Sequence, residues 1–98
     1  MSRVELAPEV SDDFERILDH LAQFDVDSIA ARIRGISQAI NVLESNPLIG
    51  RPASGDMREL VIGRRSRGYV ALYRYVPEID TAFVLAVRSQ REAGYKKR

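Results

Sequence analysis

The spacing of apolar residues along this chain changes at Asn46-Pro47, and this change limits the folds that are available to it. Before this point, apolar residues recur every three or four positions in two stretches, as on one face of an amphipathic helix. They are Val10, Phe14, Ile17, Leu18, Leu21 and Phe24 in the first stretch, and Ile29, Ile33, Ile36, Ile40 and Leu43 in the second. After this point, short segments alternate or run apolar as strands do. The two patterns together predict one α+β domain over residues 1–98.

Local signals set the expected ends of the two helices. Pro8 suits the first turn of the first helix, because an N–H group is not needed there. Asp27 is expected to cap the second helix, and Asn46-Pro47 to end it, because the residue before a proline is disfavoured in helical geometry. The short connection between the two helices predicts a helical hairpin. Gly35 lies in the middle of the second helix, where we expect it to let the first helix approach closely.

Four segments are expected to form strands: Ser2–Leu6, Arg58–Ile62, Tyr69–Val76 and Thr81–Arg88. Short turns join the last three, which predicts an antiparallel meander, and residues 47–55 are expected to form a loop. The first strand must join the same sheet to bury its apolar side. The predicted fold is therefore β-α-α-β-β-β, an antiparallel sheet with the helical hairpin packed on one face. The opposite face is expected to be open and basic, with Arg74 on it.

Charge is distributed unevenly along the chain, although its formal net value is only +1. Residues 1–46 carry four arginines and nine acidic residues, a net charge of −5. Residues 47–98 carry nine arginines, two lysines and five acidic residues, a net charge of +6. Because arginine suits bidentate contact with phosphates and carboxylates, the basic half predicts a recognition surface. The alternative is a fold whose oppositely charged halves attract each other.

Several classes of protein are excluded by residues that the sequence lacks. It has no cysteine, which excludes a disulfide scaffold and thiolate metal sites and fits a cytoplasmic protein. No apolar run reaches the roughly 18–20 residues of a membrane span, so no membrane association is expected. His20 is the only histidine and is expected on a solvated helix face, because no second histidine or cysteine could complete a metal site. We therefore expect no metal and no cofactor.

Four segments together resemble toxins of the RelE/ParE superfamily, which are partners in bacterial type II toxin–antitoxin modules. These segments are Asn46–Pro52, Met57–Gly63, Tyr69–Tyr75 and Val84–Tyr95, and the resemblance covers essentially the whole chain. The resemblance implies a toxin that is held inactive by a cognate, ParD-like antitoxin, whose C-terminal segment lies along it. An acidic, amphipathic segment of this kind is expected to bury side chains left at the surface of the hairpin: Phe14, Leu18, Leu21 and Ile33.

The resemblance implies one of two activities. RelE-like members cleave messenger RNA on the ribosome, whereas ParE-like members poison DNA gyrase. RelE-like members carry lysines on the strand after the helices and an arginine early in the next strand, where this chain has Glu59, Val61 and Val70. Arg91 and Tyr95 match the RelE-like pattern, although they lie closer together than that pattern has them. The resemblance therefore favours a gyrase poison that is not an enzyme.

On this interpretation the residues that bind the target are Arg74, Arg88, Arg91, Tyr95, Lys96 and Lys97. Two alternatives stay open. A ribosome-dependent mRNA endonuclease would use Arg74, Arg91 and Tyr95 as catalytic residues, with Arg88 and Tyr73 in the same cluster. A degenerate toxin would bind its antitoxin and have no toxic activity. At strand spacing, Tyr73 and Tyr75 are otherwise expected to be aromatic residues of the core or the sheet face.

Overall fold

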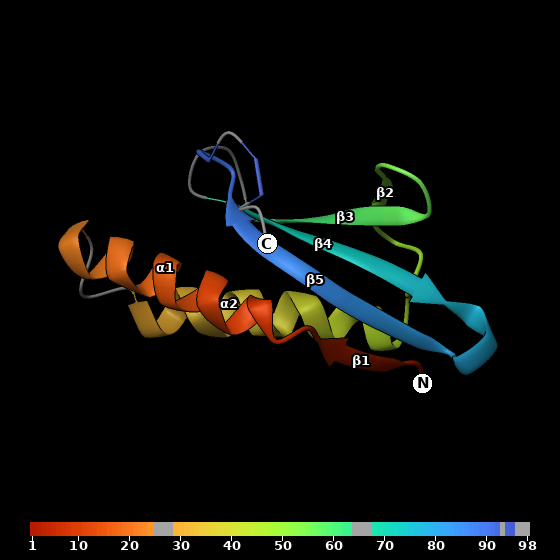
Figure 1. Ribbon diagram of the computed structural model, residues 1–98. Coiled ribbons are helices and arrows are strands. Elements are labelled where there is room, and N and C mark those ends of the chain that lie inside the picture. The colour runs from red at the N-terminus through yellow and green to blue at the C-terminus, as the bar shows by residue number, and fades with distance from the viewer. Residues whose placement is uncertain (25–28, 64–67, 93, 96–98) are drawn as a thin grey trace.

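The computed structural model describes residues 1–24, 29–63, 68–92 and 94–95. These residues form two helices and five strands (Figure 1). The strands are β1 (Arg3–Leu6), β2 (Arg51–Pro52), β3 (Met57–Ile62), β4 (Tyr69–Val76) and β5 (Thr81–Ser89), and the helices are α1 (Glu9–Phe24) and α2 (Ile29–Asn41). The predicted β-α-α-β-β-β order is confirmed, with the two-residue strand β2 added inside the expected loop.

The strands form one sheet in the order β1-β5-β4-β3-β2. Neighbouring strands from β2 to β5 pair antiparallel, whereas β1 runs parallel to β5, with Arg3 opposite Thr81 and Leu6 opposite Val84. The direction of β1 follows from the connections, because α1 continues the path of β1 and α2 brings the chain back (Figure 1). β3 therefore runs in the same direction as β1. β5, two strands later along the chain, runs in that direction again. The sheet is mixed rather than wholly antiparallel.

The core lies between the sheet and the helical hairpin, which covers one face (Figure 1). Alternate residues of β4 face the helices, and Tyr69, Ala71 and Tyr73 are buried there. The helices contribute the predicted apolar positions, among them Val10, Ile17, Ile36, Ile40 and Leu43. Leu21 also belongs to this core, at 5% exposure, so it does not offer the surface contact expected of it.

Tyr73 is fully buried, as expected of a core aromatic residue, and its hydroxyl has a partner inside the protein. The backbone N–H of Gly50 donates a hydrogen bond of 2.9 Å to the Tyr73 hydroxyl. A Cβ atom at position 50 would come within 2.6 Å of Cε1 of Tyr73, so the close approach of the chain to the ring requires a glycine there. This contact holds the segment between α2 and β2 against the sheet.

Two side chains of α1 take the place of a missing strand beside β5. β1 ends at Leu6, opposite Val84, so the outer edge of β5 has no strand partner beyond that point. Asp13, only 1% exposed, accepts a hydrogen bond of 2.9 Å from the backbone N–H of Val87. Arg16 donates from Nη2 to the Val87 carbonyl at 3.2 Å and pairs with Asp13 at 2.8 Å. Both backbone groups of Val87 are thus satisfied, as burial requires.

The helices differ from the sequence expectation in two respects. α2 ends at Asn41 and tightens into a 3₁₀ turn at Val42–Glu44, several residues before the Asn46-Pro47 break that was expected to end it. Gly35 is exposed, and a Cβ atom there would have no neighbour within 4 Å, so the expected close approach of α1 is wrong. The expected cap, Asp27, lies outside the described residues. Among the described residues, no helix is long and apolar enough to cross a membrane.

Candidate functional site

The described residues after β5, 90–92 and 94–95, fold back over the sheet face that the helices leave open. The Tyr95 hydroxyl donates a hydrogen bond of 2.7 Å to Oε2 of Glu59, on β3. The Arg88 guanidinium, on β5, lies 5.0 Å from the centre of the Tyr95 ring, within the range of a cation–π contact. Tyr95 therefore spans from β3 to β5 across β4. Val70 of β4, which pairs with Arg88, is only 2% exposed although no helix covers this face.

The contact between Tyr95 and Glu59 fixes the protonation of both groups. The hydrogen bond from Tyr95 lowers the pKa of Glu59 below its usual range, and Arg51, 3.2 Å away, acts in the same direction. Burial, together with the Glu59 carboxylate, raises the pKa of Tyr95 far above its ordinary value. At neutral pH the phenol is therefore a protonated hydrogen-bond donor, and it is unsuited to accept a proton from a substrate.

A second contact anchors the same segment to α1. Arg16 binds Glu92 through two hydrogen bonds, from Nε to Oε1 at 3.1 Å and from Nη2 to Oε2 at 3.0 Å. This planar, two-point pairing gives a more defined geometry than a single ion pair. Nη1 of Arg88 also donates to the Glu92 carbonyl at 3.2 Å. The turn after β5 is therefore fixed at Glu92 as well as at Tyr95.

The three arginines expected on this surface lie at different places. Arg74 is exposed near the far end of β4, where it pairs with Asp56 at 3.0 Å. Arg88 shares its sheet face but pairs with Val70, four residues away along β4, which corresponds to roughly 13 Å. Arg91 is exposed in the turn after β5, beyond Arg88. Lys96 and Lys97 lie outside the described residues.

The described residues do not form the nuclease cluster of the alternative interpretation. Arg74 lies near one end of β4, whereas Arg91 follows the strand that pairs with the other end. Tyr73 is buried on the helix side of the sheet and cannot reach either arginine. Tyr75 also packs against the core, with its hydroxyl donating to Asp80 at 2.6 Å.

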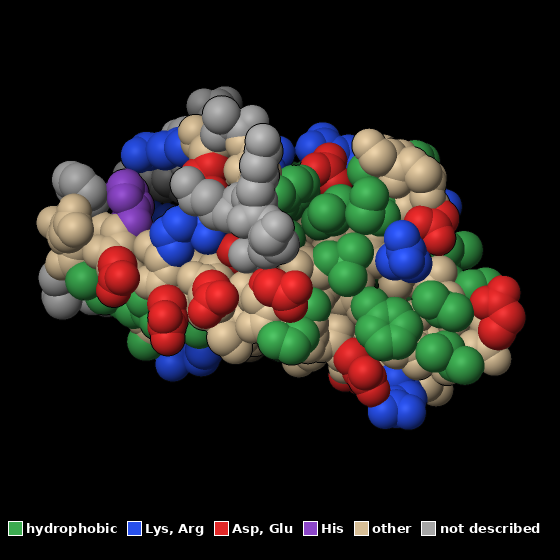
Figure 2. Space-filling view, in the orientation of Figure 1, with side chains coloured by type: hydrophobic (Ala, Val, Ile, Leu, Met, Phe, Trp, Pro, Cys, Tyr) green, Lys and Arg blue, Asp and Glu red, His purple; other side chains and the backbone are tan. Residues whose placement is uncertain are grey.

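The open sheet face is more apolar than the sequence led us to expect. The register places Met57 and Phe83 beside Arg74, and Leu72 and Val76 on the same face of β4. These four apolar side chains are half-buried. Figure 2 shows hydrophobic side chains gathered over this part of the molecule with few charged groups between them. The described arginines of this face therefore stand within an apolar surface.

A hollow of about 280 Å³ lies beside the turn after β5. Arg16, His20, Tyr69, Ser89 and Arg91 line it, together with Ile17 and Glu92. His20 is exposed, as expected. Among the described residues, no group of three or more histidine, aspartate or glutamate side chains could hold a metal ion.

Comparison with known proteins identifies the family. A family model described as the ParE toxin of the type II toxin–antitoxin system parDE matches residues 4–94. The chain belongs to the ParE toxin family. It is thus a type II toxin of the RelE/ParE superfamily, as the four sequence segments indicated. No curated protein matches this ParE toxin by sequence.

Solved structures of toxin–antitoxin systems share the fold of this ParE toxin. The chromosomal ParDE system of P. aeruginosa matches with a TM-score of 0.76 and 18% identity, over 91% of this chain and 96% of the other. The intact RelBE complex of E. coli matches with a TM-score of 0.62 and 14% identity, over 94% and 100%. The RelBE2 complex of Mycobacterium tuberculosis matches with a TM-score of 0.60 and 21% identity, over 93% of each chain. At these identities the likeness concerns the fold.

Sequence reasoning missed the acidic residues that hold the C-terminal segment in place. Glu59 was noted only as a departure from the nuclease pattern, whereas it is the acceptor for Tyr95. Glu92 and its partner Arg16 were not singled out, because they lie 76 positions apart. The signal available for Glu59 was the position of its carboxylate on the open face of β3. Nothing in the neighbouring sequence indicated which residue after β5 would contact it.

Proposed function

We propose that this ParE toxin poisons DNA gyrase and so blocks replication. The observation that carries the proposal is the hydrogen bond between Tyr95 and Glu59. Metal-free cleavage of RNA needs a base, an acid and cations around one phosphate. Here the one matching phenol is bound to a carboxylate, which would repel a phosphate, and Arg74 pairs with Asp56 far from Arg91. A surface that binds a protein target needs no such cluster.

The gyrase-binding surface is proposed to include Arg88, Arg91 and Tyr95 together with Lys96 and Lys97. Arg91 is exposed beside the anchored turn, and an arginine held on a fixed backbone is a common centre of a protein interface. Arg74 and the apolar side chains around it would extend this surface along β4.

A ParD-like antitoxin is the proposed inhibitor. The solved relatives of this fold are described as toxin–antitoxin systems or complexes, which supports such a partner. Of the hairpin residues proposed to contact it, Leu18 is 37% exposed, and Phe14 and Ile33 are half-buried against the core. These three side chains leave apolar surface for a partner to cover.

The test is a supercoiling and DNA-cleavage assay with purified toxin and gyrase, run beside an mRNA-cleavage assay on programmed ribosomes. We expect loss of supercoiling and accumulation of linear DNA, with intact mRNA. Arg91→Ala should weaken this inhibition by about tenfold or more. Arg3→Ala, which removes an exposed arginine at the other end of the chain, is the matched control and should change nothing. Cleaved mRNA with normal gyrase activity would overturn the proposal, and inactivity in both assays would favour a degenerate toxin.

A further inference from the structure

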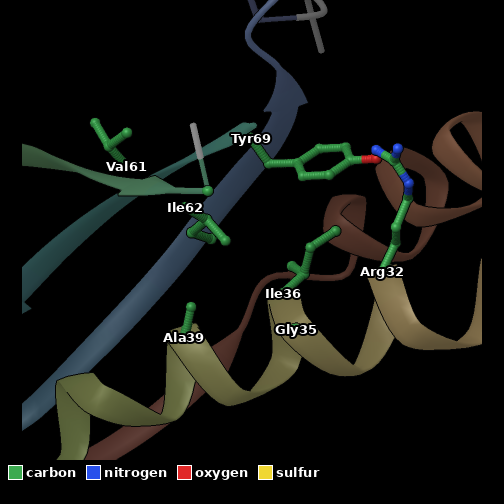
Figure 3. A pocket seen from close by; sticks show the side chains of 8 residues that line it. Arg32, Gly35, Ile36, Ala39, Val61, Ile62 and Tyr69 are labelled. Carbon is green, nitrogen blue, oxygen red and sulfur yellow. The ribbon is translucent and has the colours of Figure 1, made fainter. Parts of the chain in front are cut away.

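The hollow of about 280 Å³ beside the turn after β5 lies between α1, the start of β4 and the end of β5. Its lining is mainly apolar, and the buried side chains of Ile17 and Tyr69 form its floor. Tyr69 also lines a groove beside α2, where its hydroxyl end points toward Arg32 (Figure 3). Sites for small-molecule ligands have roughly 300–1,000 Å³. The hollow therefore suits a single side chain of a partner better than a whole ligand.

Two arginines line the hollow, and they differ in how their charge is offset. Arg16 binds Glu92 through two hydrogen bonds and also pairs with Asp13, so its charge is offset within the protein. The Arg91 guanidinium makes no hydrogen bond and no ion pair with any described residue. Only the backbone N–H of Arg91 is bonded, to Oγ of Ser89 at 3.2 Å. The hollow thus has one positive charge available for a partner.

The backbone that carries Arg91 is fixed on both sides of it. The Gln90 N–H donates a hydrogen bond of 3.0 Å to the Gly68 carbonyl, at the start of β4. The Glu92 N–H donates to the Ser89 carbonyl at 3.1 Å and closes the turn. Binding a partner therefore does not have to order this backbone, and only the Arg91 side chain loses freedom.

The charge and the floor together specify the chemistry of the partner group. The planar guanidinium of Arg91 suits two-point contact with a carboxylate or a phosphate. Binding to nucleic acid rests on many phosphate contacts, which one available arginine does not supply, and a phosphate would leave the apolar floor uncovered. An aspartate or glutamate side chain satisfies both parts, because its CH₂ groups pack on Ile17 and Tyr69 while its carboxylate meets Arg91. The hollow therefore favours an acidic side chain of a protein.

We propose that the hollow receives an aspartate or glutamate side chain of gyrase, with Arg91 binding the carboxylate and with Ile17 and Tyr69 contacting the rest of the side chain. This inference rests on the proposed function, and it adds the chemistry of the group that the toxin recognises. It extends the gyrase-binding surface around the end of β5 to α1, where His20 lies at the rim of the hollow.

Filling the hollow tests the inference in the supercoiling assay with purified gyrase. His20 is exposed, so His20→Trp adds a large ring at the rim and leaves the core unchanged. It should raise the toxin concentration that halves supercoiling by about tenfold or more. Ala22→Trp makes a similar addition at an exposed position about 200° around α1 and should leave this concentration within about twofold. A thermal melt of each variant shows that it is folded.

A charge series at Arg91 tests the carboxylate. Arg91→Lys keeps the charge and loses the planar fork, so it should weaken inhibition less than Arg91→Glu, which adds repulsion. Arg34→Glu makes the same charge change at an exposed position of α2 and should leave inhibition within about twofold. Titration calorimetry of toxin with gyrase in the absence of DNA should give the same order. A defect of Arg91→Glu that appears only with DNA present would assign the hollow to a phosphate and overturn the inference.

The outcomes separate this inference from the proposed function. If the wild-type toxin does not inhibit gyrase, the proposed function is wrong and this inference falls with it. If the wild type inhibits and folded His20→Trp inhibits equally well, gyrase is the target but the hollow does not contact it, whatever Arg91 contributes. Should His20→Trp fail to fold, the charge series decides, and equal inhibition by Arg91→Glu and the wild type would count against the inference.

Discussion

Tyr95 reaches Glu59 because the chain after β5 turns back over the sheet, so a residue near the C-terminus completes the surface of a strand 36 positions earlier. The phenol and the carboxylate each change the chemistry available to the other. Glu59 is held ionised, and Tyr95 is held protonated. Tyr95, which matched the nuclease pattern in the sequence, therefore acts as an anchor for the C-terminal segment.

Removing this one hydrogen bond should produce a loss of stability that depends on pH. Tyr95→Phe keeps the ring and deletes the hydroxyl, and should lower the free energy of unfolding by about 1 kcal/mol at pH 7. Because folding lowers the pKa of Glu59 from a usual value of 4.5, the pair stabilises the protein above that pH and loses its contribution as pH falls further. Urea denaturation at pH 7 and pH 3 should therefore show a smaller difference between wild type and variant at the lower pH.

Tyr75→Phe provides the matched control for this variant. It deletes the hydrogen bond of another phenol to a carboxylate, Asp80, on the β4–β5 turn. Both variants should lose some stability, but only Tyr95→Phe should weaken gyrase inhibition, since Tyr75 lies away from the C-terminal segment. A difference between wild type and Tyr95→Phe that is the same at pH 3 and pH 7 would show that Glu59 is not the relevant partner.

At the level of elements, the junction between α1 and β5 depends on Asp13. Asp13→Ala should lower the free energy of unfolding by about 2–3 kcal/mol, because it leaves the buried Val87 N–H without an acceptor and removes one carboxylate from Arg16. Asp12→Ala, at the exposed neighbouring position, should cost no more than about 0.5 kcal/mol. Urea denaturation gives both values, and hydrogen exchange should show lost protection at the Val87 amide. Equal losses for the two variants would contradict this assignment.

Secondary structure could be predicted where local sequence signals mark both ends of an element. Tyr69–Val76 was predicted to the residue, because Gly68 precedes it and Pro77 ends it. The end of α2 was not predicted correctly, because the last turn changes from α to 3₁₀ geometry before the proline. Asp13 lies three residues after Val10 and four before Ile17, and it is buried on that face although it is acidic. The spacing of apolar residues alone cannot identify a buried polar residue whose side chain bonds to the backbone of an edge strand.

The candidate site was predictable only in part, because its contacts join distant segments. Arg88 and Tyr95 were assigned to one surface, and the structure brings them together. Arg74 was assigned to the same surface but lies at the other end of the sheet, since a register cannot be read before the strands are paired. The parallel direction of β1, in contrast, follows from the connectivity and could have been derived from the element order.

In the whole molecule, the two proposed binding surfaces lie on opposite sides of the sheet. Phe14 and Ile33, which are proposed to contact the antitoxin, pack on the helix side of the sheet, whereas Tyr95 packs on the other face of β3. Inhibition by the antitoxin and action on gyrase should therefore be separable by changes to different parts of the chain.

Truncation after Gly94 tests this separation, because it removes Tyr95 and the three basic residues that follow it. The loss of the Tyr95 anchor and of three positive charges should abolish gyrase inhibition. Antitoxin binding should stay within about twofold of the wild type, because the hairpin side chains proposed to contact the antitoxin are unaltered. Calorimetry with the antitoxin and the supercoiling assay should be run on the same preparation, with a thermal melt to show that the truncated chain is folded. A folded truncated toxin that has lost both activities would mean that the antitoxin also contacts the C-terminal segment, and the two surfaces would then be one.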